Sequence, residues 1–180
     1  PDPAAVEAAA AGLTGPIMQV PPMVSAIRVD GKRLHELARE GVEVEREARP
    51  VTVHRFGVTP TDDPMVWRAE VQCSSGTYVR VLAADLGVAL GGGAHLRGLR
   101  RTAIGSFTVA EAVPVEDLDP ERLLAPASAL RDHPSVVVDA DLLAAVRHGK
   151  VLPYEAVAPT TFPGTPLDVE DPAWAVLDPD

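Results

Sequence analysis

The sequence predicts an α+β fold, in which a β-rich sheet is flanked by helices. Two patterns lead to this prediction. Residues 67–73 alternate between apolar and polar side chains, which is typical of a half-buried strand. Apolar residues at 82, 83, 86, 89 and 90 follow the spacing of one helix face. Further strand-like segments do not alternate regularly with helices, so an alternating parallel fold is not predicted.

The chain begins with a short predicted helix. Asp2 is a suitable N-cap, Pro3 suits the first helical position, and an alanine-rich run ends at Gly12. An extended segment, "IMQVPP", leads to a turn at Asp30-Gly31. Leu34, Leu37 and Ala38 then share one face of a second short helix, which Gly41 ends.

Two strands and a helix are predicted next. Residues 42–58 read as a strand, the turn "TDDP" spans residues 61–64, and a second strand follows in "VWRAEVQCS". Trp67, Ala69, Val71 and Cys73 share one face of it, which makes Cys73 a small core residue. Residues 91–93 are glycines that end the next helix; they lack the spacing of a phosphate-binding loop.

The remainder divides into three parts. Residues 94–112 are predicted to form further strand broken at Gly105, and residues 113–134 form a linker containing Pro114, Pro120, Pro126 and Pro134. From residue 135 to 180 we expect a strand, an Asp139 cap and a short helix, followed by a Pro-rich stretch. This last part resembles the beginning of a second small domain.

The composition favours a soluble protein of the cytoplasm. The 180 residues are 46% hydrophobic and 23% charged, and no run approaches the roughly 18 apolar residues that span a membrane. One cysteine, Cys73, excludes an internal disulfide and a multi-cysteine zinc site, and no signal-peptide pattern opens the chain.

The net charge of −10 is unevenly distributed. Residues 1–101 carry 12 Lys/Arg and 12 Asp/Glu, whereas residues 102–180 carry 4 and 14. Within the first part, basic residues cluster between 28 and 55 and again at Arg80, Arg97, Arg100 and Arg101. A local basic face for nucleic acid is therefore possible, and a solvated surface of mixed charge is the alternative.

Tyr78 and Arg80 are the most informative candidates for a site. They stand at the predicted start of a helix, where a tyrosine ring can stack on a base and a guanidinium can hold a carboxylate or phosphate with two hydrogen bonds. A core tyrosine and a surface arginine are the alternative. The five histidines show no metal-ligand spacing, and no serine nucleophile elbow occurs, so we expect no metal site.

Three stretches resemble a known family. "VPPMVSAIRVDGKRLHELAREGVEVEREARPVTV", "CSSGTYVRVLAADLG" and "GGGAHLRGLRRTAIGSF" are similar, in order and spacing, to the bacterial tRNA pseudouridine-55 synthases, which modify the TΨC loop. The resemblance implies a mixed-sheet catalytic core, of which residues 1–112 are the C-terminal part, and a partial PUA-like domain at 135–180. It implies isomerisation of uridine without a cofactor and binding of the tRNA TΨC stem-loop. Separately from the resemblance, we expect a monomer of the cytoplasm that binds neither metal nor membrane.

Roles for individual residues follow from the same resemblance. Tyr78 is expected against the flipped base, Arg80 beside the nucleophilic aspartate, and Leu99 in the apolar wall of the pocket. Residues 19–41 match the family's thumb, which folds over the RNA loop; we call them the thumb segment. The expected RNA contacts are basic residues of the thumb segment and of the second cluster: Arg28, Lys32, Arg33, Arg100 and Arg101.

The chain departs from the family pattern at the nucleophile. The Gly-Thr-Leu-Asp-Pro type motif is absent; "GTPLD" at 164–168 has another order, so Asp168 is interpreted as a loop residue and Asp85 as a structural one. Val24 stands where many relatives have tyrosine. We therefore expect these 180 residues to be inactive by themselves, and the alternative function is a non-catalytic RNA-binding or interaction module.

Overall fold

The computed structural model describes residues 1–29, 31–152 and 175–177. The chain forms two compact units, residues 1–99 and residues 100–180. Asp168 and most of the predicted PUA-like region lie outside the described residues. The domain boundary predicted at residue 112 and the PUA-like assignment remain predictions.

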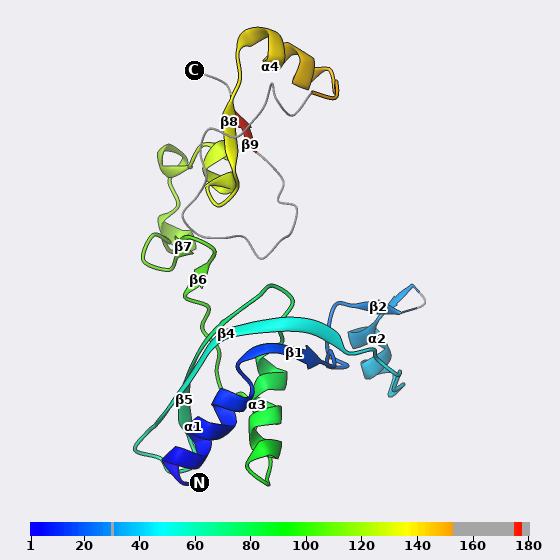
Figure 1. The fold of residues 1–180 in the computed structure, drawn as a ribbon, viewed down its shortest axis with the longest axis vertical. Helices are drawn as coiled ribbons and strands as arrows, with labels where there is room; N and C mark the ends of the chain where they lie inside the picture. Colours follow the sequence, from blue (N-terminus) through cyan, green and yellow to red (C-terminus); the bar gives the residue numbers. More distant parts are fainter. Residues whose placement is uncertain (30, 153–174, 178–180) are drawn as a thin grey trace. The chain divides into compact units, whose positions relative to one another are not determined.

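The first unit is built on an antiparallel sheet (Figure 1). Its three strands are β1 (Gly15–Gln19), β4 (Arg49–Pro60) and β5 (Trp67–Cys73), with β4 in the middle. These described strands run antiparallel throughout, so the mixed strand directions that the family resemblance implies are not found in this sheet. The α+β class is confirmed.

Two helices cover one face of the sheet. Helix α1 (Pro3–Gly12) begins at Asp2, whose carboxylate accepts the Ala5 N–H at 3.2 Å, as predicted. It packs with α3 (Val79–Ala89) against β4, and both helices lie on the same side of the strands in Figure 1. Apolar side chains from all these elements form the core: Val6, Ala10, Phe56, Val58, Trp67, Leu86 and Leu90.

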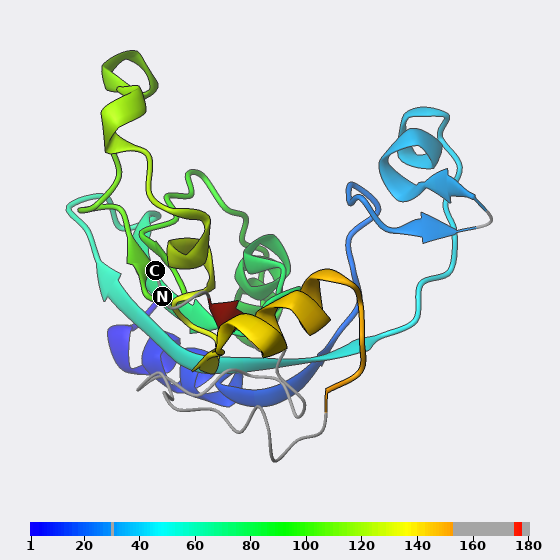
Figure 2. The same ribbon diagram turned by 90° about the horizontal axis from the view of Figure 1, so that it is seen from above.

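Strand β4 differs from the prediction at its beginning. Residues 42–48 are not in a strand, because β1 ends at Gln19 opposite Arg49 and offers no partner before that position. The strand curves along its length (Figure 2), and its register with β5 shifts between Val53 and Arg55. The shift leaves His54 as the extra residue of a bulge, a feature that increases the local bend of a strand.

A small hairpin and helix occupy the thumb segment. Strands β2 (Arg28–Val29) and β3 (Lys32–Arg33) pair around Gly31, whose φ of 82° requires the freedom of glycine, and α2 (Leu34–Arg39) follows directly. Asp30 of the predicted turn lies outside the described residues. The predicted helix is confirmed.

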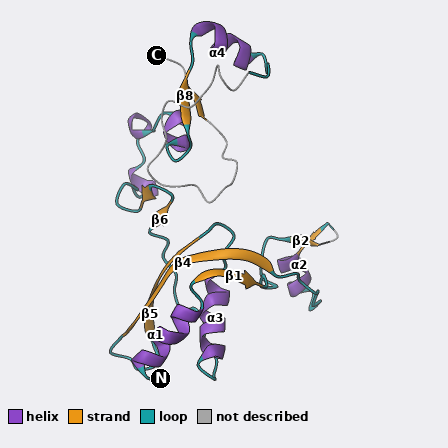
Figure 3. Cartoon of the chain, viewed as in Figure 1, coloured by secondary structure: helices purple, strands orange, loops and turns teal. Residues whose placement is uncertain are grey.

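The second unit has short elements, shown in Figure 3. Strands β6 (Ala103–Ile104) and β7 (Phe107–Thr108) form a hairpin around Gly105, and the predicted linker contains the 3-10 turns η1 (Val115–Asp117), η2 (Pro120–Arg122) and η3 (Pro126–Leu130). Strand β8 (Ser135–Val137) pairs in parallel with β9 (Ala175–Leu177).

Helix α4 (Ala140–Arg147) follows β8 in the second unit. Its N-cap is Asp139, as predicted, since the carboxylate accepts the Leu142 N–H at 2.9 Å. In the described part of the chain, no helix is long and apolar enough to cross a membrane.

Candidate functional site

The turn between β5 and α3 carries the predicted Tyr78 and is anchored at its beginning by the neighbouring strand β4. The Ser74 N–H donates to the Thr52 carbonyl at 2.8 Å, and the Ser74 hydroxyl accepts the Thr52 N–H at 2.9 Å. Inside the turn, the Thr77 hydroxyl donates to the Ser74 carbonyl at 2.9 Å, and Gly76 has a φ of 79°. Hydrogen bonds to β4 and within the turn therefore hold its backbone in one conformation.

The far end of the turn is held by a side chain from β1. Gln19 Oε1 accepts the Tyr78 N–H at 2.7 Å, and Gln19 Nε2 donates to the Tyr78 carbonyl at 3.2 Å. Gln19 is only 2% exposed. One amide thus pairs with both backbone groups of the residue that caps α3, and Tyr78 is half-buried at that position. The Tyr78 carbonyl also accepts the Val81 and Leu82 N–H groups of the helix.

Arg80 lies in the first turn of α3 with an exposed side chain. A cation there is opposed by the positive end of the helix dipole, so this position is unfavourable for a merely solvated arginine. Its Nη2 donates to the Val24 carbonyl of the thumb segment at 2.8 Å. Tyr78 and Arg80 are therefore both tied to residues 19–24, and the structure brings these predicted site residues together with the base of the thumb segment.

The β2–β3 hairpin presents three exposed cations. Arg28 pairs directly with Arg33 across the two strands, and Val29 pairs with Lys32. Like charges opposite one another destabilise a strand pair, which favours an anion between or beside them. Lys32 Nζ lies 3.5 Å from a carboxylate oxygen of Glu40, a surface ion pair of small energetic value.

The hairpin is supported from beneath by α2. Leu34 is fully buried, and its N–H donates to the Ile27 carbonyl at 2.8 Å. The N–H of His35 donates to the Ser25 carbonyl at 3.2 Å, and its ring Nδ1 lies 3.1 Å from the same oxygen. The Glu36 carboxylate accepts the Arg33 N–H at 3.0 Å, and this hydrogen bond lowers the pKa of Glu36. These contacts fix the backbone from which Arg28, Lys32 and Arg33 project.

The other predicted residues are not brought to Tyr78 in the same way. Leu99 is 64% exposed at the end of the first unit. Arg100 and Arg101 open the second unit and are exposed. Asp85 lies on α3, where burial raises the pKa of its carboxyl group. The roles assigned to Leu99, Arg100 and Arg101 remain predictions.

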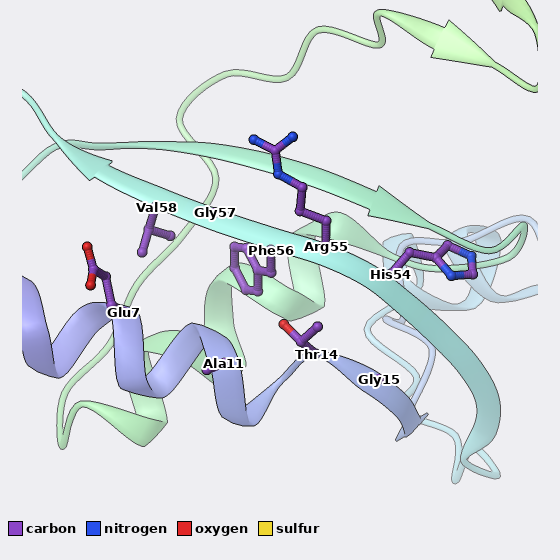
Figure 4. A pocket seen from close by; sticks show the side chains of 9 residues that line it. All are labelled: Glu7, Ala11, Thr14, Gly15, His54, Arg55, Phe56, Gly57 and Val58. Atoms are coloured by element: carbon purple, nitrogen blue, oxygen red, sulfur yellow. The ribbon is translucent and has the colours of Figure 1, made fainter.

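A shallow groove of about 600 Å³ lies between α1 and β4 (Figure 4), and the turn contributes no residue to its lining. Its polar lining comes from Glu7, Thr14, His54 and Arg55. Strand periodicity did not indicate this groove, because the bulge at His54 depends on the pairing of β4 with β5. Among the described residues, no three His, Cys, Asp or Glu side chains form a cluster that could hold a metal ion.

Sequence patterns do not single out Gln19 as a site residue, although β1 carries a signal for it. Residues 15, 17 and 19 of β1 face the same side, and the other two are Gly15 and Ile17. A glutamine in the inward register of a strand must find hydrogen-bond partners there. Its partner, Tyr78, is 59 residues away in the chain, and this distance explains why the pairing could not be inferred.

Comparisons with known proteins show the family of this chain. Residues 1–79 match the family model of the TruB family pseudouridylate synthase N-terminal domain, and residues 80–135 match the tRNA pseudouridylate synthase B C-terminal domain. The fold and these matches define a pseudouridylate synthase domain. The chain belongs to the TruB family.

Similar curated proteins carry the name tRNA pseudouridine synthase B. That of Symbiobacterium thermophilum is 54% identical over 75% of this chain and 46% of its own length, and that of Mycobacteroides abscessus is 43% identical over 96% and 59%. The chain spans about half the length of the curated relatives it matches. A solved structure, a Cbf5-Nop10-Gar1 complex, matches with a TM-score of 0.68 at 25% identity, over 88% of this chain and 47% of that one.

Proposed function

We propose that this chain is part of a tRNA pseudouridine synthase that isomerises uridine 55 in the TΨC loop of tRNA. The observation that carries the proposal is the joint anchoring of Tyr78 and Arg80 to the base of a basic hairpin. A residue suited to stacking on a base and a residue suited to holding a carboxylate thereby stand next to a segment suited to phosphates. The family match supports the same assignment.

The reaction is an isomerisation, so atoms and electrons balance without an added reagent. The bond between N1 of uracil and C1′ of the ribose breaks, the base turns, and a bond forms between C5 and C1′. C5 then loses its proton, and N1 carries a proton in the product. No net oxidation occurs, which is why the chemistry requires no redox cofactor.

Tyr78 and Arg80 have distinct roles in this proposal. The target base must leave its stack to be reached, and the Tyr78 ring offers a face against which the flipped base stacks. Arg80 uses one N–H of Nη2 for the Val24 carbonyl, which leaves other N–H groups of the guanidinium for a carboxylate. That carboxylate is the nucleophilic aspartate of the family, and Leu99 contributes to the apolar wall around the base.

The hairpin supplies the electrostatic part of RNA binding. Arg28, Lys32 and Arg33 project from one small strand pair and bind phosphates of the TΨC stem-loop. Arg100 and Arg101 add a second basic contact from the beginning of the other unit. Phosphate contacts position the loop, whereas the choice of uridine depends on the pocket that receives the flipped base.

The experiment that tests this function is release of tritium from a TΨC stem-loop labelled at C5 of its target uridine. A full-length enzyme that carries these 180 residues is expected to release one tritium per RNA. The same RNA with cytidine at the target position is the control and should release none. Binding of the RNA without tritium release would instead support the alternative, a non-catalytic RNA-binding module that keeps the synthase scaffold.

A further inference from the structure

The structure assigns a further role to Gln19, whose side chain bridges the backbone N–H and carbonyl of Tyr78. We infer that Gln19 is a positioning residue: it sets the place of the Tyr78 ring and of the Arg80 guanidinium without touching the substrate. The inference rests on the proposed function, because it concerns the geometry in which those two side chains meet the uridine.

The two hydrogen bonds restrain the peptide, and this restrains the ring. Gln19 contacts the N–H and the carbonyl of Tyr78, so the orientation of that residue's backbone is fixed on both sides of its Cα. Gln19 is 2% exposed, so water does not compete for the same donors and acceptors. Loss of the amide would leave the Tyr78 N–H without this partner, whereas the Tyr78 carbonyl would keep the Val81 and Leu82 N–H groups of α3.

Gln19 can hold the end of the turn in place because the sheet fixes its own backbone. The beginning of the turn, at Ser74, is held by Thr52 of β4, and its end is held by Gln19 of β1. Gln19 is the last residue of β1 and pairs with Arg49, so its backbone is fixed by the sheet. Hydrogen bonds from two neighbouring strands thus hold the two ends of the turn. Removal of the hydrogen bonds from either strand would loosen the corresponding end.

The same residue begins the thumb segment. Five residues later the Val24 carbonyl accepts the Arg80 guanidinium, and Arg80 is two residues after Tyr78. Residues 19–24 and 78–80 are therefore joined at both of their ends. A change at Gln19 is expected to move Tyr78 first and Arg80 with it, because both lie at the start of α3.

The test compares Gln19→Leu with Val6→Ala in the full-length enzyme carrying this chain. Leucine keeps much of the volume of glutamine and removes both hydrogen bonds. Val6 lies on α1 and is buried in the core, so its truncation to alanine lowers the stability of the protein without removing a hydrogen bond to Tyr78. Gln19→Leu should lower the single-turnover rate about tenfold or more and leave the affinity for the TΨC stem-loop within about twofold. Val6→Ala should leave both values near those of the wild type.

A double-mutant cycle provides a measurement that a merely structural role would not change. If Gln19 acts through the Tyr78 ring, the rate losses of Gln19→Leu and of Tyr78→Ala, which removes the ring, will not multiply in the double variant. Losses that multiply would overturn the inference. So would a Gln19→Leu enzyme that turns over like the wild type. A wild-type enzyme without tritium release would contradict the proposed function instead, which keeps the two failures distinguishable.

Amide exchange in the full-length enzyme tests the geometry without catalysis. The Tyr78 N–H should exchange faster in Gln19→Leu than in the wild type, and the change in Val6→Ala should be smaller. Equal protection of the Tyr78 amide in wild type and Gln19→Leu would show that Gln19 does not restrain it, and would overturn the inference even where the variant enzyme is slow.

Discussion

Arg28 and Arg33 lie directly opposite each other in the β2–β3 hairpin, with both side chains exposed. Two guanidinium groups at this spacing repel each other in the free protein. A phosphate placed beside them removes the repulsion and releases the counterions that the nucleic acid held. The Arg28–Arg33 pair therefore destabilises the hairpin in the free protein and favours the binding of an RNA phosphate.

The first prediction concerns the salt dependence of RNA binding. Arg28→Gln should weaken binding of the TΨC stem-loop and reduce the slope of log K against log salt by about one unit, with little change in sequence preference. Filter binding over a range of salt concentrations measures the slope. Arg68→Gln, at an exposed position of β5, is the matched control and should keep the wild-type slope. An unchanged slope in Arg28→Gln would remove this residue from the phosphate contacts.

The second prediction concerns the geometry of Arg80. Lysine keeps the positive charge but cannot hold the Val24 carbonyl and a carboxylate in the planar arrangement of a guanidinium. In a full-length enzyme, Arg80→Lys should lower turnover about tenfold or more, with RNA affinity nearly unchanged. Single-turnover conversion and filter binding of the same stem-loop measure the two quantities. The 180 residues by themselves should form no pseudouridine, and activity in them would contradict the assignment of Arg80 as partner of a separate aspartate.

The third prediction is a pH dependence in the second unit. Two hydrogen bonds from Arg131, at 2.9 and 3.1 Å, together with the N–H and hydroxyl of Thr108, lower the pKa of Glu111 from 4.5 to about 2. A group whose pKa is lower in the folded state stabilises that state above its unfolded pKa. The contribution of Glu111 should therefore be complete above pH 4.5 and decline as the pH falls through about 2.

Protection of the Thr108 amide against exchange measures this effect locally, because that N–H donates to Glu111 at 2.9 Å. Glu111→Gln should lower the protection at neutral pH, and the difference from the wild type should shrink toward pH 2. Glu116→Gln, at an exposed position of η1, is the control. A difference between Glu111→Gln and the wild type that stays constant down to pH 2 would contradict the ion pair with Arg131.

The fourth prediction concerns Gly87, which is buried within α3. A Cβ atom there would collide with the backbone of Gly93 and Ala94, which passes close to the helix. Gly87→Ala should therefore destabilise the protein by about 1–3 kcal/mol, although alanine is the better helix former. Gly12→Ala, at the end of α1, has open space around the new Cβ and should be neutral or stabilising by up to about 1 kcal/mol.

Urea unfolding compares these two glycine variants with the wild type. Destabilisation in Gly87→Ala with none in Gly12→Ala would confirm that close backbone approach, and not helix propensity, selects the glycine in α3. Equal effects at both positions would contradict the packing of residues 93–94 against the helix.

The sequence by itself determined the local elements of this protein. The caps at Asp2 and Asp139, the alternation of residues 67–73 and the helical spacing after residue 79 all predicted elements that the structure confirms. These signals succeed because capping and side-chain periodicity are set by neighbours within a few residues. The three ordered motifs likewise led to the family, and the family models match the same region.

Only the tertiary structure decided how these elements meet. Strand β4 begins at Arg49 and not at residue 42, because β1 determines where pairing is available. The bulge at His54 depends on the register between β4 and β5. The bonds of Gln19 to Tyr78 and of Arg80 to Val24 join residues 59 and 56 positions apart. No periodicity or local propensity encodes such separations, since they are fixed by strand pairing and by the packing of α3 against α1.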